Sequence, residues 1–303
     1  MKEENFNIPV ENGLNLLVRV WKPNTPNGKV MHLLHGMSEH CFRYADFAKY
    51  CVNNGYTVYA HDHRNHGYSL RNDDTLGIFL KRDTFEKLVE DVLMVQNEIY
   101  YREDTTEIIT LGHSMGSIIL RRYLQMNPPL VSKAIIMGTL PRYPGYYSGL
   151  MIGLAYISGL FINQDKRHYF IAKSMSKNTS KGVDSQLKNA WISNDETIVK
   201  AYNEDPLSAF VYNKYFYRYF FQCIHKTNKL KNIAMTKNIP HLFISGSKDS
   251  VIQSMKNIDR LTADYHRVIP NFNSTVLTIK DSRHEVLNDI DKIATYKKII
   301  DWI

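Results

Sequence analysis

A serine lies at the centre of Gly112-His113-Ser114-Met115-Gly116, which is a G-x-S-x-G pattern. The apolar run EIITLGHS ends at this serine, and a stretch with helical periodicity follows directly. This context predicts a nucleophile elbow, a sharp strand-to-helix turn in which the two glycines relieve crowding around a strained serine. The pattern therefore predicts nucleophilic catalysis by Ser114.

A serine hydroxyl needs a base to take its proton and a third group to orient that base. After a nucleophile elbow, the acid and then the histidine follow along the chain, each near the carboxyl end of a strand. Asp249 lies three residues after HLFISG, and His284 lies three residues after STVLTIKD, so we expect both to join Ser114 in a triad. Two other histidines are weaker candidates: His241 starts a predicted strand, and His266 falls in a predicted helix-to-strand connection.

The tetrahedral intermediate of such a reaction needs two backbone N–H donors for its oxyanion. One donor should be Met115, directly after the nucleophile, and the other should follow the strand that ends at His35-Gly36. That second residue is Met37, whose side chain we expect to line the acyl pocket.

A different chemistry is suggested by AHDHRNHGYS, which places His61, His63 and His66 within six residues. Imidazoles at this spacing can converge on a zinc ion. A two-metal hydrolase also needs further ligands from later strands, and none can be assigned here. We therefore expect no metal or other cofactor.

Short β-rich runs alternate with stretches of helical periodicity, which predicts a mostly parallel sheet flanked by helices. The first two runs, residues 6–10 and 14–21, are joined by Glu-Asn-Gly, so the sheet should begin with an antiparallel hairpin. Residues 43–54 and 85–101 have the apolar spacing of amphipathic helices. Six later runs complete eight predicted strands, at residues 29–36, 56–62, 107–114, 133–138, 241–246 and 274–281.

The long interval before the run at 241–246 exceeds what one crossover helix requires, so we expect an inserted helical cap over residues 141–232. Residues 1–140 and 233–303 would form the two parts of the core. The net charge is +8, and residues 141–231 hold 13 Lys and Arg against 6 Asp and Glu, with 17 of the 36 aromatic residues. No recognised nucleic-acid module accompanies this segment. A lipid-facing or substrate-covering element is favoured, with a solvated basic face as the alternative.

The 303 residues suffice for a sizeable core, and the three cysteines form no C-x-x-C pair that would indicate a disulfide framework or a thiolate zinc site. The polar N-terminus has no apolar segment behind a basic start, so we expect a cytoplasmic protein. The longest apolar run, residues 148–162, is short for a membrane span and is broken by three glycines. It could instead rest on a bilayer surface, as a peripheral contact through the cap.

Taken together, the motifs resemble the monoacylglycerol lipase and lysophospholipase group of the α/β-hydrolases. The resemblance rests on HGMSEHCFRY, AHDHRNHGYS, LGHSMGS, FISGSKDSV and RHEVLND, with YNEDPL similar to a cap element of the group. It implies an α/β-hydrolase fold, a triad of Ser114, Asp249 and His284, and an oxyanion hole from the Met37 and Met115 amides. It also implies that the loop from Asp62 to Ser69 supports the active-site floor, so that its histidines pack and hydrogen-bond.

These observations predict a serine ester hydrolase that cleaves fatty-acyl monoesters through an acyl-enzyme intermediate. A short-chain carboxylesterase or a thioesterase is the alternative. An aminopeptidase is less favoured because no acidic anchor for a substrate amine can be named. A ligand receptor built on the same fold also stays open, because a fold alone does not fix a function.

Overall fold

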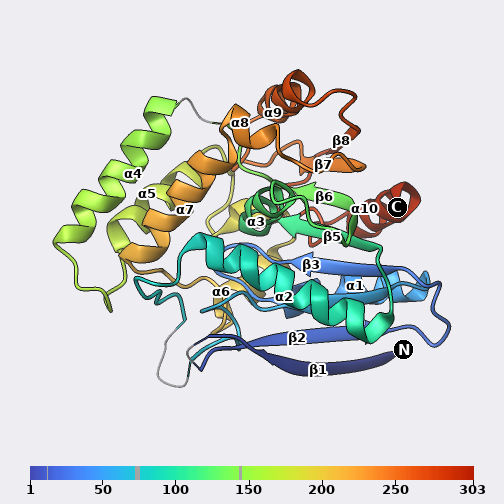
Figure 1. The fold of residues 1–303 in the computed structure, drawn as a ribbon. Helices are drawn as coiled ribbons and strands as arrows, with labels where there is room; N and C mark the ends of the chain where they lie inside the picture. Colours follow the sequence, from blue (N-terminus) through green and yellow to red (C-terminus); the bar gives the residue numbers. More distant parts are fainter. Residues whose placement is uncertain (12, 72–75, 143–144) are drawn as a thin grey trace.

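The computed structural model describes residues 1–303 apart from 12, 72–75 and 143–144, and its core is an eight-stranded sheet (Figure 1). The strand order is β1-β2-β4-β3-β5-β6-β7-β8. The β1–β2 and β2–β4 pairs are antiparallel and the other pairs are parallel, which confirms the predicted mostly parallel sheet. The strands are β1 (Lys2–Pro9), β2 (Asn15–Lys22), β3 (Val30–Leu34), β4 (Thr57–His61), β5 (Ile108–His113), β6 (Val131–Met137), β7 (His241–Gly246) and β8 (Ser274–Ile279).

The expected hairpin is formed by β1 and β2, although Asn12 of its turn lies outside the described residues. The central strands β3, β4, β5 and β7 are buried along their whole length. Burial on both faces explains why these strands are continuous apolar runs and do not alternate with polar residues. Their carboxyl ends lie at one edge of the sheet, where ligand chemistry collects in folds of this kind.

Helices cover both faces of the sheet (Figure 1). On one face, α1 (Ala45–Asn53) and α10 (Lys292–Trp302) pack on residues of β3, β4, β5 and β7. On the other face, α2 (Phe85–Glu103), α3 (Met115–Leu124) and α9 (Met255–Val268) share a core with β6 and with the helices that follow it. The helix expected over residues 43–54 begins later than predicted, because a 3-10 turn, η1 (Cys41–Tyr44), precedes α1.

The segment between β6 and β7, which we call the cap below, is helical and lies beside the core (Figure 1). Its longest helix, α4 (Gly145–Leu160), carries most of the apolar run at residues 148–162. In α7 the side chains of Phe216, Phe220 and Ile224 are buried, so much of the aromatic content of this segment faces inward. The elements are α4 (Gly145–Leu160), α5 (Tyr169–Thr179), η2 (Ala190–Ile192), α6 (Glu196–Glu204), α7 (Lys214–Thr227) and α8 (Leu230–Ile233).

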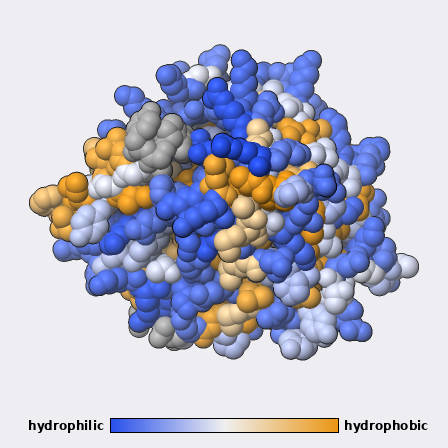
Figure 2. Space-filling view, turned by 45° about the horizontal axis from the view of Figure 1, so that its top comes forward, coloured by the Kyte–Doolittle hydropathy of each residue, from blue (hydrophilic) through white to orange (hydrophobic). Residues whose placement is uncertain are grey.

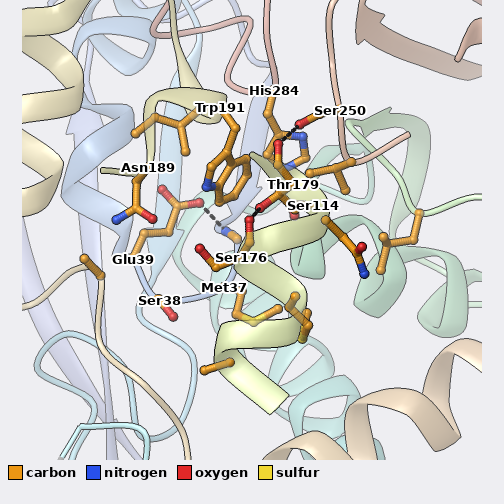
Figure 3. Close-up of a pocket in the computed structure, with 18 of the residues that line it drawn as sticks. Met37, Ser38, Glu39, Ser114, Ser176, Thr179, Asn189, Trp191, Ser250 and His284 are labelled. Carbon is orange, nitrogen blue, oxygen red and sulfur yellow. Dashed lines mark hydrogen bonds between the residues drawn. The ribbon is translucent and has the colours of Figure 1, made fainter. Parts of the chain in front are cut away.

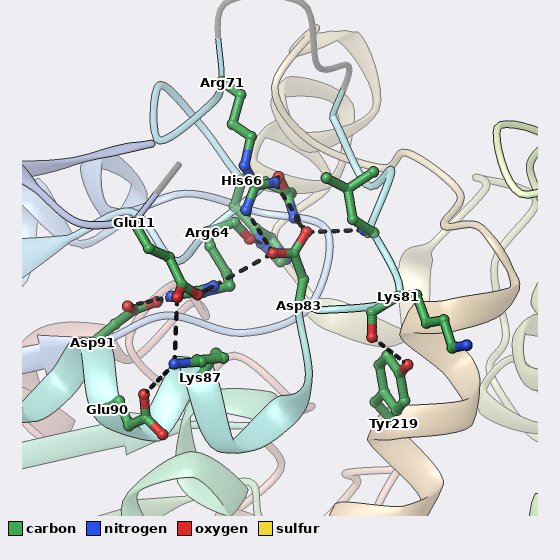
Figure 4. A network of polar contacts seen from close by, with 12 residues as sticks. Glu11, Arg64, His66, Arg71, Lys81, Asp83, Lys87, Glu90, Asp91 and Tyr219 are labelled. Atoms are coloured by element: carbon green, nitrogen blue, oxygen red, sulfur yellow. Dashed lines mark hydrogen bonds and ion pairs between the residues drawn. The ribbon is translucent and has the colours of Figure 1, made fainter. Parts of the chain in front are cut away.

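A buried ionic network holds the loop after β4 against α2 (Figure 4). The Arg64 guanidinium donates to both oxygens of Asp91, at 2.6 and 2.7 Å. Arg71 donates to both oxygens of Asp83, at 2.5 and 2.9 Å. Because a broken ion pair would leave an uncompensated charge in the interior, this network fixes the loop that carries His66.

Candidate active site

Ser114 occupies a strained turn between β5 and α3, as the motif predicts. Its φ and ψ are 51° and −114°, and its N–H donates to the Met137 carbonyl at 2.9 Å. A Cβ atom on Gly116 would lie 2.2 Å from the Leu34 carbonyl oxygen, and one on Gly112 would lie 2.4 Å from the Gly116 carbonyl oxygen. Only glycine therefore allows β3, β5 and α3 to approach closely enough to form this elbow.

The structure brings Asp249 and His284 into contact from two loops. Asp249 follows β7 and His284 follows β8, and the His284 Nδ1 atom lies 2.9 Å from Asp249 Oδ2. Both residues are buried, at 3% and 2% exposure. Burial alone would disfavour the imidazolium, but the adjacent Asp249 carboxylate outweighs it and raises the pKa of His284 above its ordinary value.

The imidazole of His284 lies between two other rings. The His113 ring centroid is 4.8 Å away and the Trp191 ring centroid is 5.3 Å away. Trp191 belongs to η2, and its carbonyl oxygen accepts from the backbone N–H of His284 at 3.5 Å. Sequence reasoning missed Trp191, which has no motif to mark it.

Ser114 and His284 line one cavity together with Met37 (Figure 3). The buried Nε2 atom of His284 has no hydrogen-bond partner among the described residues, so it is available to a group that enters the cavity. Met37 follows Gly36 after β3, and Met115 is the first residue of α3, where a helix leaves its N–H groups unpaired. The positions of both amides suit the expected oxyanion donors.

The two weaker histidine candidates lie away from this cavity. His241 is the first residue of β7, as expected, and its Nδ1 is 2.6 Å from the Ile239 carbonyl oxygen. The prediction for His266 was wrong in detail. This residue lies in the last turn of α9, because the helix continues to Val268 before the chain turns into β8.

A buried cluster of three charged residues supports the site, and no role was assigned to them from the sequence. Arg43 donates to both oxygens of Glu285, at 2.6 and 2.8 Å, and to Glu39 at 2.8 Å. Glu39 in turn accepts from the Gly36 N–H at 2.5 Å. Burial opposes ionisation of Glu39, but the hydrogen bond from His113 and the charge of Arg43 outweigh it and lower the pKa of this carboxyl. The sequence held two signals of this cluster: Glu285 directly follows the expected catalytic histidine, and Glu39 and Arg43 lie four residues apart in HGMSEHCFRY.

The YNEDPL element contacts the same loop from the cap. Asp205 Oδ2 lies 2.7 Å from His40 Nε2, and the Arg43 guanidinium lies 4.7 Å from the centre of the Tyr202 ring. The resemblance of this short segment therefore corresponds to a docking contact between the cap and the β3 loop.

The histidines of AHDHRNHGYS pack and hydrogen-bond, in agreement with the prediction for this loop. His61 and His63 are fully buried, and the His61 Nδ1 atom lies 2.9 Å from His32 Nε2. Burial lowers the pKa of His32 to about 3 and that of His66 to about 4, so these imidazoles are neutral near pH 7. Within the described ranges, no group of three or more His, Cys, Asp or Glu side chains is arranged to hold a metal ion. We call the five buried residues the histidine cluster: His32, His35, His61, His63 and His66.

The Asp62 carboxylate organises the same loop. It accepts from the Cys41 N–H at 2.8 Å and from the Tyr68 N–H at 2.9 Å, which ties the β4 loop to η1. The Ser69 hydroxyl oxygen accepts from the Leu17 N–H of β2 at 2.9 Å. These bonds fix the loop against η1 and β2, and the ring of His66 packs on Phe210, which lines the cavity.

The cavity has a volume of about 530 Å³, within the usual range of about 300–1,000 Å³ for small-molecule sites. Most of its wall is apolar, and helices of the cap supply a large part of it. Polar side chains from α5 and from the segments that follow it also reach the lining, Ser176 and Asn189 among them (Figure 3). The apolar and aromatic residues from the cap include Met151, Tyr169, Ala172, Met175, Trp191, Ile192, Tyr202, Ala209, Phe210, Val211, Tyr217, Phe220, Phe221 and Ile224.

The sheet, the nucleophile elbow and the order of the site residues define an α/β-hydrolase. A carboxyl esterase from Bacillus coagulans, solved with glycerol, has the same fold, with a TM-score of 0.87 and 22% identity over 100% of this chain and 98% of that one. Residues 25–291 match the family described as serine aminopeptidase, S33. The chain belongs to that family, and it is a serine hydrolase.

Two curated relatives cover nearly the whole chain. A monoglyceride lipase homolog from monkeypox virus is 26% identical over 290 residues, which are 94% of this chain and 92% of the relative. A monoacylglycerol lipase from Mycolicibacterium smegmatis is 27% identical over 300 residues, which are 96% of this chain and 93% of the relative. This set of relatives places the chain among ester-hydrolysing members of the fold, as predicted.

Proposed function

We propose that the protein hydrolyses long-chain fatty-acyl monoesters of the monoacylglycerol and lysophospholipid type. Ser114 attacks the ester carbonyl while His284, oriented by Asp249, takes the hydroxyl proton. The Met37 and Met115 amides stabilise the oxyanion, and the alcohol leaves with the proton from His284. Water activated by His284 then releases the fatty acid and restores the serine.

The observation that carries this proposal is the apolar cavity of about 530 Å³ that opens onto Ser114 and His284. Burial of each methylene is worth about 0.8 kcal/mol, so four added methylenes supply about 3 kcal/mol. If all of this energy is used in the transition state, kcat/KM rises by about 200-fold from a C4 to a C8 ester. Such a gain is expected only of an enclosed acyl site.

The charges around the site favour an ester over a substrate with a free amine. An aminopeptidase needs a carboxylate that can bind the substrate ammonium group. Glu39 and Glu285 line the cavity, but both are bonded to Arg43. Their negative charge is already compensated, so neither offers a strong site for an added cation.

We also propose that the cap contacts a membrane surface through α4. Its Met151 and Ala155 side chains face the protein interior, whereas Leu154 and Ile157 are 44% and 58% exposed. Phe161, just after the helix, is 86% exposed, and hydrophobic residues gather at the left of Figure 2, on the side where Figure 1 has α4. A helix that exposes several large apolar side chains to solvent suits a position against a membrane surface. In the part of the chain that the structure describes, no helix has the length and apolar character to cross a bilayer.

The test is hydrolysis of 1-monoacylglycerols and p-nitrophenyl esters of increasing chain length by wild type and by Ser114→Ala. We expect kcat/KM to rise with chain length up to a plateau, and all turnover to vanish in the variant. Activity confined to short esters would refute the long-chain assignment and favour a carboxylesterase. Equal inactivity of both proteins on every ester would refute the proposal entirely.

The membrane contact is tested separately by co-sedimentation with vesicles of phosphatidylcholine and phosphatidylglycerol. Replacing Leu154 and Ile157 with serine should reduce binding, because both side chains are exposed and their loss removes apolar area from the bilayer contact. The double variant should keep its activity on a soluble short ester. Unchanged sedimentation would contradict a contact through α4.

A further inference from the structure

The loop that contains Met37 is held from two sides. On the core side, the Gly36 N–H donates to Glu39 Oε1 at 2.5 Å. On the cap side, the Ser38 N–H donates to the Tyr212 hydroxyl oxygen at 2.5 Å. Met37 lies between these two anchored amides, so the direction of its own N–H depends on both.

Ser38 makes two more hydrogen bonds to the same cap segment, residues 209–212. Its hydroxyl donates to the Phe210 carbonyl oxygen at 2.8 Å, and its carbonyl oxygen accepts from the Ala209 N–H at 2.9 Å. The φ angle of Ser38 is +57°, a left-handed conformation that costs an L-residue roughly 1–2 kcal/mol. Such a conformation persists only where the surroundings enforce it, and here the three bonds from the cap do so.

Tyr212 is itself rigidly placed. It is fully buried, and its ring stacks on Phe216 with the ring centroids 3.5 Å apart and the planes at 11°. The next residue, Asn213, caps α7 and exchanges hydrogen bonds with the backbone of Phe79 at 3.2 and 2.7 Å. The hydroxyl group therefore stays in one position relative to the core.

The hydrogen-bond directions around this hydroxyl follow from its partners. His66 Nδ1 lies 2.9 Å from the Arg64 carbonyl oxygen, which can only accept, so Nδ1 carries the proton of the neutral ring. His66 Nε2 must then accept, and it lies 2.7 Å from the Tyr212 oxygen. The Tyr212 hydroxyl donates to His66 and uses its oxygen to accept from Ser38, so a continuous chain links the β4 loop, the cap and the β3 loop.

We propose that Tyr212 is a positioning residue that sets the direction of the Met37 amide in the oxyanion hole. An oxyanion donor must lie about 2.7–3.1 Å from the developing charge, so a small rotation of the loop removes its contribution. The cap thus acts on transition-state stabilisation as well as on substrate binding. This inference rests on the proposed oxyanion role of Met37.

The experiment compares Tyr212→Phe with wild type, using p-nitrophenyl butyrate as the substrate. The phenyl ring keeps the stack on Phe216, and only the hydroxyl is lost. We expect kcat to fall about tenfold or more with little change in KM, since outright removal of an oxyanion donor costs about 10²–10³-fold. A matched control is Tyr123→Phe, another buried tyrosine, whose hydroxyl lies 3.1 Å from the Gln96 side-chain oxygen. Its kcat should stay within twofold of wild type.

Two ligands separate positioning from general disruption of the cavity. An alkyl trifluoromethyl ketone adds to Ser114 as a tetrahedral adduct, so its Ki should weaken by the same factor as kcat. A glycerol monoalkyl ether cannot react, and its Kd should not change. If Tyr212→Phe is folded and keeps both kcat and Ki within twofold of wild type, the inference is wrong. A parallel loss of ketone and ether affinity would also overturn it.

A second variant covers the case in which Tyr212→Phe does not fold. Ser38→Ala removes only the bond to the Phe210 carbonyl and should give the same pattern, with a smaller loss of kcat and an unchanged ether Kd. An unaltered kcat in this variant would then refute the inference. Failure of the proposed substrate is visible separately, because wild type would cleave p-nitrophenyl butyrate but no long-chain monoacylglycerol.

Discussion

Replacing Asp249 with asparagine perturbs the base without changing its shape or volume. A carboxylate can only accept, so the 2.9 Å contact places the proton of neutral His284 on Nδ1 and leaves Nε2 free to accept. An asparagine can present its NH₂ group to Nδ1, which moves the ring proton to Nε2. The lone pair that should receive the Ser114 proton is then lost.

The size of the loss in kcat distinguishes the loss of one hydrogen bond from the reversal of the His284 tautomer. A hydrogen bond to a charged group contributes about 1.5–3 kcal/mol, so loss of this bond alone would lower kcat by roughly 10- to 150-fold. A reversed tautomer in a triad of this geometry costs about 10⁴-fold, or about 5.4 kcal/mol. Because Asp249 and His284 are 3% and 2% exposed, water cannot readily restore the original tautomer. We therefore expect the larger loss.

The assay is the steady-state kcat for p-nitrophenyl butyrate at pH 8, with a thermal melt to establish folding. Asp281→Asn is the control, because this aspartate follows β8, as His284 does, but is exposed and paired with Lys248 at 2.9 Å. Its kcat should stay within twofold of wild type. If folded Asp249→Asn retains more than a tenth of the wild-type kcat, the assignment of Asp249 as the orienting acid is refuted.

Three further outcomes are expected. The raised pKa of His284 predicts that kcat/KM falls as the pH drops through a midpoint above that of an ordinary histidine, about 6.5. The charge of Glu285 contributes to the raised pKa, so Glu285→Gln should move the midpoint to lower pH, and an unshifted midpoint would contradict this contribution. Arg43→Met leaves the buried carboxylates of Glu39 and Glu285 without their counter-charge and should lower the free energy of unfolding in urea by about 3–5 kcal/mol. Arg122→Met is the control and should cost about 1 kcal/mol or less, because the partner of Arg122, Glu86, is 37% exposed. The histidine cluster is neutral in the folded protein, whereas its imidazoles take up protons near pH 6.5 when the chain is unfolded. Because the unfolded state then binds more protons, the free energy of unfolding should fall by up to about 1.4 kcal/mol for each histidine as the pH drops from 6 to 5. A free energy of unfolding in urea that stays constant over this range would contradict the prediction.

The sheet and the expected site positions were accessible from the sequence because their signals are local. The run HLFISG coincides with β7, and EIITLGHS covers β5 and ends at the nucleophile. Buried parallel strands appear as short apolar runs, and the polar residues just beyond them must share one edge of the sheet. Chain order then selects Asp249 and His284 without any knowledge of distances.

Contacts across long sequence separations were not accessible in this way. Arg43 and Glu285 are 242 residues apart, and no local pattern indicates that they form a bidentate pair. The aromatic segment of α7 could have been interpreted further. Phe216, Phe220 and Ile224 recur at four-residue intervals, the spacing of one helix face, which predicts an inward apolar stripe.

The contacts that the sequence did not reveal are concentrated where the cap meets the core. The β3 loop is bonded to the cap through His40 and through Ser38, whose partner Tyr212 is 174 residues away. The β8 loop is bonded to η2, where the Glu285 N–H donates to the Ile192 carbonyl oxygen at 2.7 Å. The expected oxyanion loop and the loop that carries the expected base are therefore both hydrogen-bonded to the cap. A displacement of the cap must strain both loops, so changes in the cap should alter kcat as well as the choice of acyl chain.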